Sequence, residues 1–292
     1  MRVSEAGEFD LIHRLVARLE PGDLIIRPGQ DDAAAWREAD GSFTVATIDA
    51  SVEGVHFDLG WQTAEEVGRR ALALALGDLA AKGARPRYAL ISLSLPATWA
   101  VADVEDLYRG IEALAGNVGL VVAGGDVTES KGPAVISLAL LGRTTQRPRP
   151  RSDALAGWAI GVTGPLGGAA LALRERRHFE LQPRLEEGVR LAALGLVAGD
   201  ISDGLHTELI KFGLAAAIDA EAVPRVAGAD WRTAVTSGEE AELIVTGPAE
   251  ELEGAGLKRI GEFTDEGGPG PIYRTPEGEV AIAAGGYEHF RA

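Results

Sequence analysis

The feature that most constrains this fold is a set of aspartates at the tips of apolar segments. The positions are Asp31 (with Asp32 beside it), Asp49, Asp78, Asp126, Asp200 and Asp203. Carboxylates that gather in a folded chain repel one another, so the fold must supply a cation to neutralise them. Oxygen ligands of this kind suit Mg²⁺, which also binds polyphosphates. The pattern therefore predicts an enzyme that uses a magnesium nucleotide.

Composition excludes several other classes of protein. The formal net charge of −16 disfavours nucleic acid as a partner, because binding to a phosphate backbone requires a basic surface. No apolar segment is long enough to cross a membrane. The absence of cysteine excludes disulfides, thiolate nucleophiles and cysteine-ligated metal sites. Because the first residues also lack the apolar core of a signal peptide, we expect a cytoplasmic protein.

The length of 292 residues favours two domains. Hydrophobic periodicity predicts the elements of the first half. These are helices over residues 8–19, 63–83 and 101–114, and strands over 33–36, 43–48, 87–95, 119–125 and 134–142. In the second half we expect strands over 159–163, 242–246, 256–263 and 272–283, and helices over 166–174, 185–196 and 203–212. The element order predicts an α+β fold with a helix-covered sheet in the first half.

The domain boundary is predicted at the proline-rich run 147–151, where proline fixes the backbone and removes amide donors. The two domains would then cover residues 1–146 and 147–292. Within the first, Asp31 and Asp49 are expected at corresponding ends of neighbouring strands. Asp78 falls near the C-terminal end of a predicted helix, where the helix dipole disfavours a carboxylate and a bound metal would explain it.

Two motifs are candidates for binding phosphate. In Gly124-Gly125-Asp126 the glycines are expected to turn the chain sharply and let a phosphate approach backbone amides, with Asp126 facing a metal. Such a sequence more often marks an ordinary turn. The segment Asp200-Ile201-Ser202-Asp203-Gly204 places two carboxylates on one side of a short extended segment, with a helix behind it. This pair can hold Mg²⁺, but a simple helix cap fits equally well.

Other catalytic signatures are absent from the sequence. No Gly-x-x-x-x-Gly-Lys-Ser/Thr segment occurs, which excludes a P-loop kinase. Without a Gly-x-Ser-x-Gly turn, Ser202 and His56 do not indicate a hydrolase. On its own, His56 is typical of a surface or packed histidine, and no His-x-x-His spacing indicates zinc. The Asp31-Asp32 pair and Asp49 also fit ordinary turns.

In chain order, the motifs resemble those of the thiamine-monophosphate kinase family, in the superfamily of aminoimidazole ribonucleotide synthetase and selenophosphate synthetase. The resemblance covers nearly the whole chain. It is carried by Gly7-Glu8-Phe9, Asp31-Asp32-Ala33, Thr47-Ile48-Asp49, Val55-His56-Phe57, Asp78-Leu79-Ala80-Ala81, Gly124-Gly125-Asp126, Asp200 to Leu205, Ser237-Gly238-Glu239 and Gly286-Tyr287-Glu288-His289-Phe290. For the fold, it implies a mixed or antiparallel N-terminal sheet that forms a homodimer, and a C-terminal α/β domain.

For function, the resemblance implies ATP-dependent phosphorylation of thiamine monophosphate to thiamine diphosphate by direct transfer. Mg²⁺ would be the cofactor, with K⁺ as a further candidate. The implied metal ligands are Asp31, Thr47, Asp49, Asp78, Asp126, Asp200 and Asp203. The implied ATP contacts are Asp31, Gly125, Asp126, Arg151 and Ser202, and those to thiamine monophosphate are His56, Glu239 and Tyr287. Asp126 and Asp203 would be the catalytic pair.

Several positions depart from the family pattern. Gln30 and Ile48 replace a glycine and a threonine beside the predicted metal ligands, and Lys82 stands where methionine is usual. Glu240 and Ala241 replace the Asp-Tyr pair that follows the family's Gly-Gly-Glu. These changes touch the acceptor side more than the metal side. Two alternatives therefore stay open: an ATP-dependent enzyme with another acceptor, and a Mg-ATP-binding regulatory protein without catalytic activity.

Overall fold

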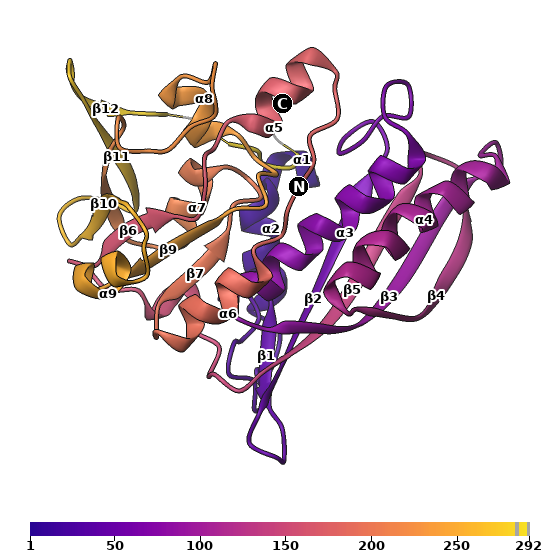
Figure 1. Cartoon of the computed structure of the whole chain (residues 1–292), viewed down its shortest axis with the longest axis horizontal. Coiled ribbons are helices and arrows are strands. Elements are labelled where there is room, and N and C mark those ends of the chain that lie inside the picture. The colour runs from indigo at the N-terminus through magenta and orange to yellow at the C-terminus, as the bar shows by residue number, and fades with distance from the viewer. Residues whose placement is uncertain (284–285, 291–292) are drawn as a thin grey trace.

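Two β-sheets, one from each half of the chain, flank the long helix α3 (Ala64–Ala81) (Figure 1). The computed structural model describes residues 1–283 and 286–290. Helix α3 contacts strands of the first sheet on one side, and α6, β7 and β9 of the second half on the other. The architecture confirms the predicted α+β class. Among the described residues, no helix combines the length and apolar character that crossing a bilayer requires.

The N-terminal sheet has five strands in the order β1-β2-β5-β3-β4. Its strands are β1 (Ala34–Arg37), β2 (Phe43–Val52), β3 (Arg85–Pro96), β4 (Val121–Ser130) and β5 (Val135–Thr144). Strands β3 and β4 pair in parallel and the other neighbours are antiparallel, so the sheet is mixed. Two short helices, α1 (Val3–Ala6) and α2 (Glu8–Val16), precede it.

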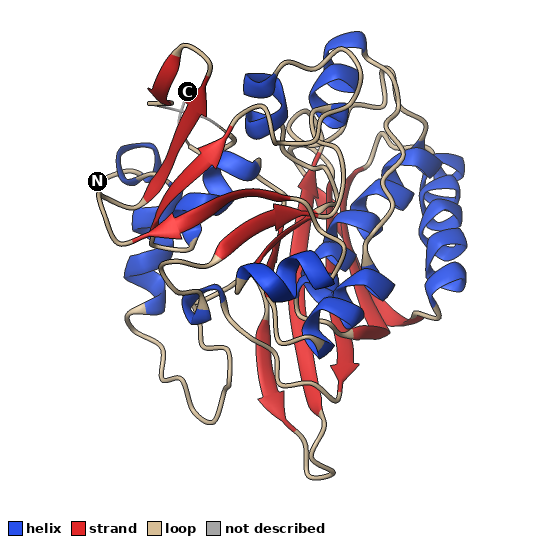
Figure 2. Ribbon diagram, turned by 60° about the vertical axis from the view of Figure 1, so that its left-hand side comes forward, coloured by secondary structure: helices blue, strands red, loops and turns tan. Residues whose placement is uncertain are grey.

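Helices α3 and α4 (Val101–Val118) lie side by side and cover one face of this sheet (Figure 2). Helix α3 begins at Thr63 because its hydroxyl accepts from the Glu66 amide, while the Glu66 carboxylate accepts from the Thr63 amide. The opposite face, here called the open face, carries exposed apolar side chains. These are Ile48, Tyr88, Leu90, Val121 and Leu141, which the strand register places on the same side.

The second sheet has seven strands in the order β12-β11-β8-β10-β6-β9-β7. Its strands are β6 (Ala159–Val162), β7 (Val197–Asp200), β8 (Ala215–Asp219), β9 (Leu243–Gly247), β10 (Arg259–Thr264), β11 (Gly270–Thr275) and β12 (Gly278–Ala281). The helices of this half are α5 (Gly168–Glu175), α6 (Leu185–Ala193), α7 (Leu205–Lys211), α8 (Trp231–Thr236) and α9 (Ala249–Gly254), after the 3₁₀ turn η1 (Arg151–Asp153). Among the described strands of this second sheet, only β8 and β11 pair in parallel.

One hydrophobic core runs through both halves. It joins Leu72 and Leu76 of α3 to Leu185 and Leu191 of α6 and to Leu243 of β9. The backbones also approach closely, since a Cβ atom on Gly188 of α6 would lie 2.0 Å from the carbonyl oxygen of Ala80. The sheets fall on either side of the predicted boundary at residues 146 and 147. Because the two halves share this core, their division into two domains stays a prediction.

Three local predictions are wrong. Gly124-Gly125-Asp126 forms no turn, because it lies inside β4, opposite β3, at a β-bulge. Gly125 is required there because a Cβ atom would lie 1.8 Å from the carbonyl oxygen of Ile91. Residues 272–283 contribute to a hairpin of β11 and β12 rather than one strand. Asp49 lies within β2 rather than at its end, since β2 continues to Val52.

Candidate active site

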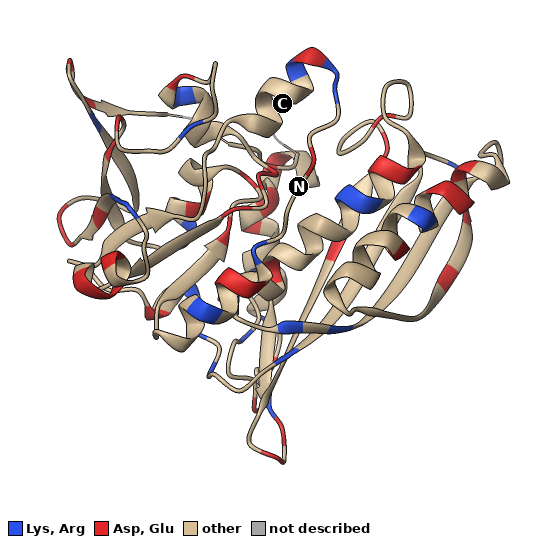
Figure 3. Cartoon of the chain, in the orientation of Figure 1, with Lys and Arg blue, Asp and Glu red and all other residues tan. Residues whose placement is uncertain are grey.

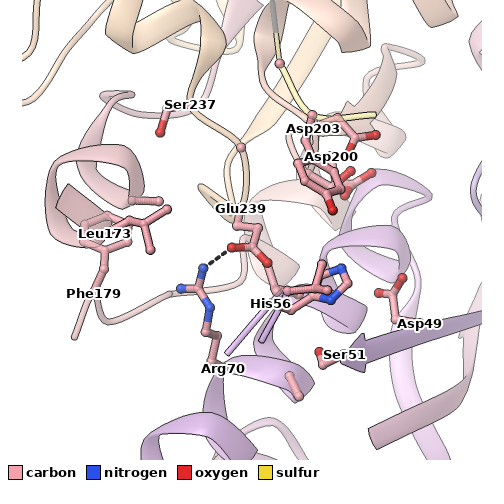
Figure 4. A pocket seen from close by; sticks show the side chains of 18 of the residues that line it. Asp49, Ser51, His56, Arg70, Leu173, Phe179, Asp200, Asp203, Ser237 and Glu239 are labelled. Carbon is pink, nitrogen blue, oxygen red and sulfur yellow. Dashed lines mark hydrogen bonds and ion pairs between the residues drawn. The ribbon is translucent and has the colours of Figure 1, made fainter. Parts of the chain in front are cut away.

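A cavity of about 690 Å³ lies between the two halves. Figure 4 shows Asp49, Asp200 and Asp203 on one side of it and Leu173 and Phe179 on the other. His56, Arg70 and Glu239 lie between these two groups. Acidic residues from several elements gather in this region (Figure 3). The cavity therefore has an acidic side and an apolar side, and its volume is that of a small-molecule site.

The acidic side brings together carboxylates from distant parts of the chain. Asp32 precedes β1, Asp78 lies in the last turn of α3, and Asp200 ends β7; each offers an oxygen atom, and these atoms lie within 4.8 Å of one another. Asp49 and Asp203 line the same cavity. The Thr47 hydroxyl donates a hydrogen bond of 2.5 Å to Asp78. The structure thus brings Asp49, Asp78, Asp200 and Asp203 to one cavity, with Thr47 beside Asp78, and their role as metal ligands stays a prediction.

Crowding perturbs the titration of these groups. Burial, together with the charge of Asp200, holds the pKa of Asp78 well above its usual range, and burial with the charge of Asp32 does the same for the pKa of Asp200. Burial and the nearby Asp32 and Asp203 carboxylates raise the pKa of Asp49 to about 6. Burial alone would also raise the pKa of Asp32, but the cations of Arg151 and Lys211 lower it.

The carboxylates around this cluster outnumber the cations among the described residues. The carboxylates are Asp31, Asp32, Asp49, Asp78, Asp200, Asp203 and Glu208, and the cations are Lys82, Arg151 and Lys211. One oxygen of Asp200 is buried and accepts no hydrogen bond. Its contact is the Arg151 guanidinium at 3.5 Å, an ion pair without a hydrogen bond. A carboxylate oxygen that accepts no hydrogen bond within a cluster of excess negative charge fits a hard divalent cation.

Asp31 does not fit its predicted roles as metal ligand and ATP contact. Its side chain is fully buried and forms ion pairs with Lys82 at 2.5 Å and Arg151 at 3.0 Å. The next residue, Asp32, is the one that joins Asp78 and Asp200. The sequence offered both aspartates of the pair, and only their opposite directions in the fold distinguish them.

Arg151 also differs from its prediction as an ATP contact. Its guanidinium is only 3% exposed and forms ion pairs with Asp31, Asp32, Asp200 and Glu208. Burial lowers its pKa, but these carboxylates together hold the pKa well above its usual range. Arg151 therefore holds the cluster carboxylates from behind and does not line the cavity. Its Nε donates no hydrogen bond but is buried against Gly199.

Gly125 and Asp126 lie away from the cluster. Asp126 belongs to a row of paired residues that crosses the sheet from β4 to β2. The row continues from Asp126 through Ser92 of β3 and Ser137 of β5 to Ala50 of β2. This row spans three strand spacings, roughly 14 Å. It lies on the open face, whereas Thr47 bonds to Asp78 on the helix-covered face. A single chain therefore does not bring Asp126 to the other predicted metal ligands, because the sheet itself separates them.

The remaining predicted contacts line the cavity. Ser202 lies between the carboxylates of Asp200 and Asp203 in sequence, and its hydroxyl lies 3.4 Å from Glu208. His56 and Tyr287 have ring centroids 6.4 Å apart, and both rings also contact His289. The Tyr287 amide donates to the carbonyl of Asp203, which ties the C-terminal segment to the Asp-Gly motif.

Glu239 adopts a left-handed backbone conformation (φ +55°) and forms an ion pair with Arg70 of α3. Sequence reasoning missed Arg70, Lys211 and His289, all of which line the cavity. A signal existed for Arg70, because it precedes Asp78 by eight residues and so shares its helix face. For Lys211 the signal was its i+3 spacing from Glu208 on a helix that follows an aspartate.

Binding of Mg²⁺ is expected to strengthen as pH rises through about 6. The pKa of Asp49 is raised to about 6, so below this pH the carboxyl is protonated and competes with the metal. The raised pKa values of Asp78 and Asp200 act in the same direction, so the apparent Kd for Mg²⁺ should be at least about tenfold higher at pH 5 than at pH 7, measured by calorimetry on the metal-free protein. Proton release on binding near pH 6 should accompany it. An affinity that is constant between pH 5 and 7 would contradict this account of the cluster.

Comparison with known proteins agrees with the geometry. Residues 30–144 match the family model described as AIR synthase related protein, N-terminal domain. The chain is 32% identical to the thiamine-monophosphate kinase of Mycobacterium tuberculosis, with 99% of this chain and 93% of that one covered. It is 28% identical to the Bacillus subtilis enzyme of that name, with 97% and 99% covered.

Solved structures extend the likeness to the fold. The structure described as AaThiL complexed with AMPPCP and TMP superposes with a TM-score of 0.85. Its sequence is 27% identical to this chain, and 99% of each chain is covered. Sequence and structure agree over nearly the full length. The chain therefore belongs to the thiamine-monophosphate kinase family.

Proposed function

We propose that this chain is a thiamine-phosphate kinase, which transfers the terminal phosphoryl group of ATP to thiamine monophosphate and forms thiamine diphosphate. The observation that carries the proposal is the two-sided cavity, with a cluster of carboxylates on one side and apolar and aromatic groups on the other. The likeness to AaThiL, which was solved with AMPPCP and TMP, supports this pairing of ligands.

Mg²⁺ is the proposed cofactor. Asp32, Asp78 and Asp200 would hold it, with Asp49 and Asp203 lining the same cavity. The Asp200 oxygen that accepts no hydrogen bond supports this choice. When bound, Mg²⁺ supplies charge neutralisation for the phosphates. A role for K⁺ stays a prediction, as does a cytoplasmic location.

Direct phosphoryl transfer requires no covalent intermediate with the protein. An oxygen of the acceptor phosphate attacks the terminal phosphorus of ATP, the bond to the bridging oxygen breaks, and ADP leaves. A dianionic acceptor phosphate has no proton to lose, so the step depends on alignment and charge neutralisation. On the acceptor side we propose that His56, Glu239 and Tyr287 contact thiamine monophosphate, with Tyr287 against a flat ring and Glu239 near its positive charge.

The departures at Glu240 and Ala241 do not favour a catalytically silent protein. Both residues are buried, and neither lines the cavity among the described residues. Glu240 accepts hydrogen bonds from the amides of Gly167 and Ala169 and from the Ser237 hydroxyl. It thus supports the loop beneath the cavity, and its replacement of aspartate removes no group that faces a substrate.

Purified protein with ATP and Mg²⁺ is expected to convert thiamine monophosphate to thiamine diphosphate, which oxidation to a fluorescent thiochrome and chromatography would detect. Release of ADP only with another phosphorylated acceptor would indicate a different enzyme of the superfamily. Tight binding of Mg-ATP with no turnover on any acceptor would indicate the regulatory protein instead.

The open face supports the homodimer. Ile48, Leu90 and Val121 of this face are 69%, 51% and 54% exposed, an unusual apolar surface for a chain that works alone. We propose that a second copy covers it and that Asp126, on the same face, serves the partner's site. Its predicted metal and catalytic roles then depend on the dimer.

A mixing experiment tests this placement of Asp126. Asp126→Asn and Asp203→Asn should each be inactive alone, but a refolded equimolar mixture should regain about a quarter of wild-type activity, because half of the dimers carry one intact site. Each variant alone, taken through the same refolding, is the control. No recovery in a mixture shown to contain hetero-dimers would place both residues in one chain's site.

A further inference from the structure

Lys211 lies at the edge of the acidic cluster and faces the cavity. It is the last residue of α7, and its ammonium nitrogen lies 2.8 Å from Asp203 and 2.8 Å from Glu208. Its side chain is 16% exposed and lines the cavity together with Asp49 and Asp200. Neither the sequence motifs nor the proposed function gives it a role.

The two other cations of the cluster cannot reach a substrate in this structure. Arg151 is 3% exposed and is held by four carboxylates. Lys82 is 1% exposed, and besides Asp31 it donates to the carbonyl oxygen of Ala198 at 2.8 Å. Lys211 is thus the cation of the cluster that borders the open volume.

The contacts of Lys211 are not needed to neutralise its helix neighbour. Glu208 already forms an ion pair with Arg151 at 2.9 Å. The charge of Lys211 also acts on the carboxylates across the cluster, since it lowers the pKa of Asp32, Asp49 and Asp200. An ammonium that borders the cavity, among groups that would hold a metal and a triphosphate, is well placed to bind phosphate as a point charge.

We propose that Lys211 is a catalytic residue that contacts the terminal phosphoryl group of ATP during transfer. On nucleotide binding its ammonium moves from Asp203 to this group, and Asp203 becomes free to serve the metal. Lys211 stays protonated throughout, while the bond between the terminal phosphorus and ADP breaks and the bond to the acceptor oxygen forms. The inference rests on the proposed function for the identity of the reaction.

The test is nucleotide discrimination by Lys211→Met. AMPPCP carries the terminal phosphoryl group and ADP lacks it, so the Kd of Mg-AMPPCP should rise about tenfold while that of Mg-ADP changes less than about twofold. Turnover should fall about a hundredfold, chiefly in kcat. Lys211→Arg keeps the charge and should retain most of the preference for AMPPCP. Lys258→Met, the same change at an exposed lysine, is the matched control.

Equal loss of affinity for AMPPCP and ADP would overturn the proposal, because a merely structural lysine affects both ligands alike. Unchanged affinity for both would also overturn it. Should Lys211→Met fail to fold, Lys211→Gln enters the same comparison. Neither ligand requires the acceptor, so wild-type protein that makes no thiamine diphosphate would refute the proposed function and still allow this test of Lys211.

Discussion

Asp200→Asn is expected to lower kcat/KM by about a thousandfold. Asp200 is buried, belongs to the cluster with Asp32 and Asp78, and has an oxygen without a hydrogen-bond partner. An amide in its place removes one negative charge and one strong ligand, and losses of this kind at a site of charge development reach two to three orders of magnitude. Steady-state kinetics at saturating Mg²⁺ would measure the loss of kcat/KM, and calorimetry would measure the loss of affinity for Mg²⁺.

Asp265→Asn provides the matched control, because Asp265 is an exposed aspartate in a loop of the second half. Its kinetics should equal those of the wild type. The metal-free Asp200→Asn protein should also be at least as stable as the wild type, since the substitution relieves repulsion in the cluster. A variant with near-normal kcat/KM and an unchanged Mg²⁺ affinity would remove Asp200 from the proposed metal site.

Arg151→Met is expected to lower the free energy of unfolding by about 3 to 5 kcal/mol. The substitution removes the cation that pairs with Asp31, Asp32, Asp200 and Glu208. Asp31 keeps Lys82 and Glu208 keeps Lys211, but the buried cluster is left with more uncompensated negative charge, and breaking a buried pair has a cost of this order. Urea denaturation at pH 7 without metal would measure it. Protonation offers partial relief, so the deficit should shrink at pH 5.

Arg147→Met is the control for this change. Arg147 is 58% exposed and pairs with Asp153 at 3.4 Å, and an exposed pair of this kind contributes less than about 1 kcal/mol. If both variants lost the same small amount, the buried network around Arg151 would not hold the cluster together. If Arg151→Met kept wild-type stability and lost only affinity for ATP, the result would support the prediction from the sequence that Arg151 contacts ATP directly.

The sequence predicted the fold class and the order of most elements because their signals are local. Helix α3, with Thr63 and Glu66 at its start, combines a capping box with a long apolar face, and the Asp40-Gly41 turn specifies the hairpin of β1 and β2. Short buried strands such as β7 and β8 were not predicted, because a run rich in Ala and Gly has no hydrophobic periodicity that distinguishes a strand from a loop.

The sequence allowed prediction of which residue types form the candidate site, but not of the direction in which each side chain points. Aspartate at the tips of apolar segments indicated Asp78, Asp200 and Asp203, and the structure brings all three to one cavity because the end of α3 and the end of β7 meet there. Their role as metal ligands stays a prediction. Nothing local reveals that Asp31 points toward Lys82 while Asp32 points toward Asp200, or that Asp126 faces away across a sheet. Such facts depend on pairings between residues far apart in sequence.

The core shared through α3 has a consequence for how ligands enter. A clamshell hinge between the two halves would strip Leu72 and Leu76 from their partners on α6 and separate Gly188 from Ala80, at a cost in exposed apolar area. We therefore expect the nucleotide to enter and the product to leave through small displacements of residues that border the cavity, such as Leu173 and Tyr287. The shared core beneath them should not move.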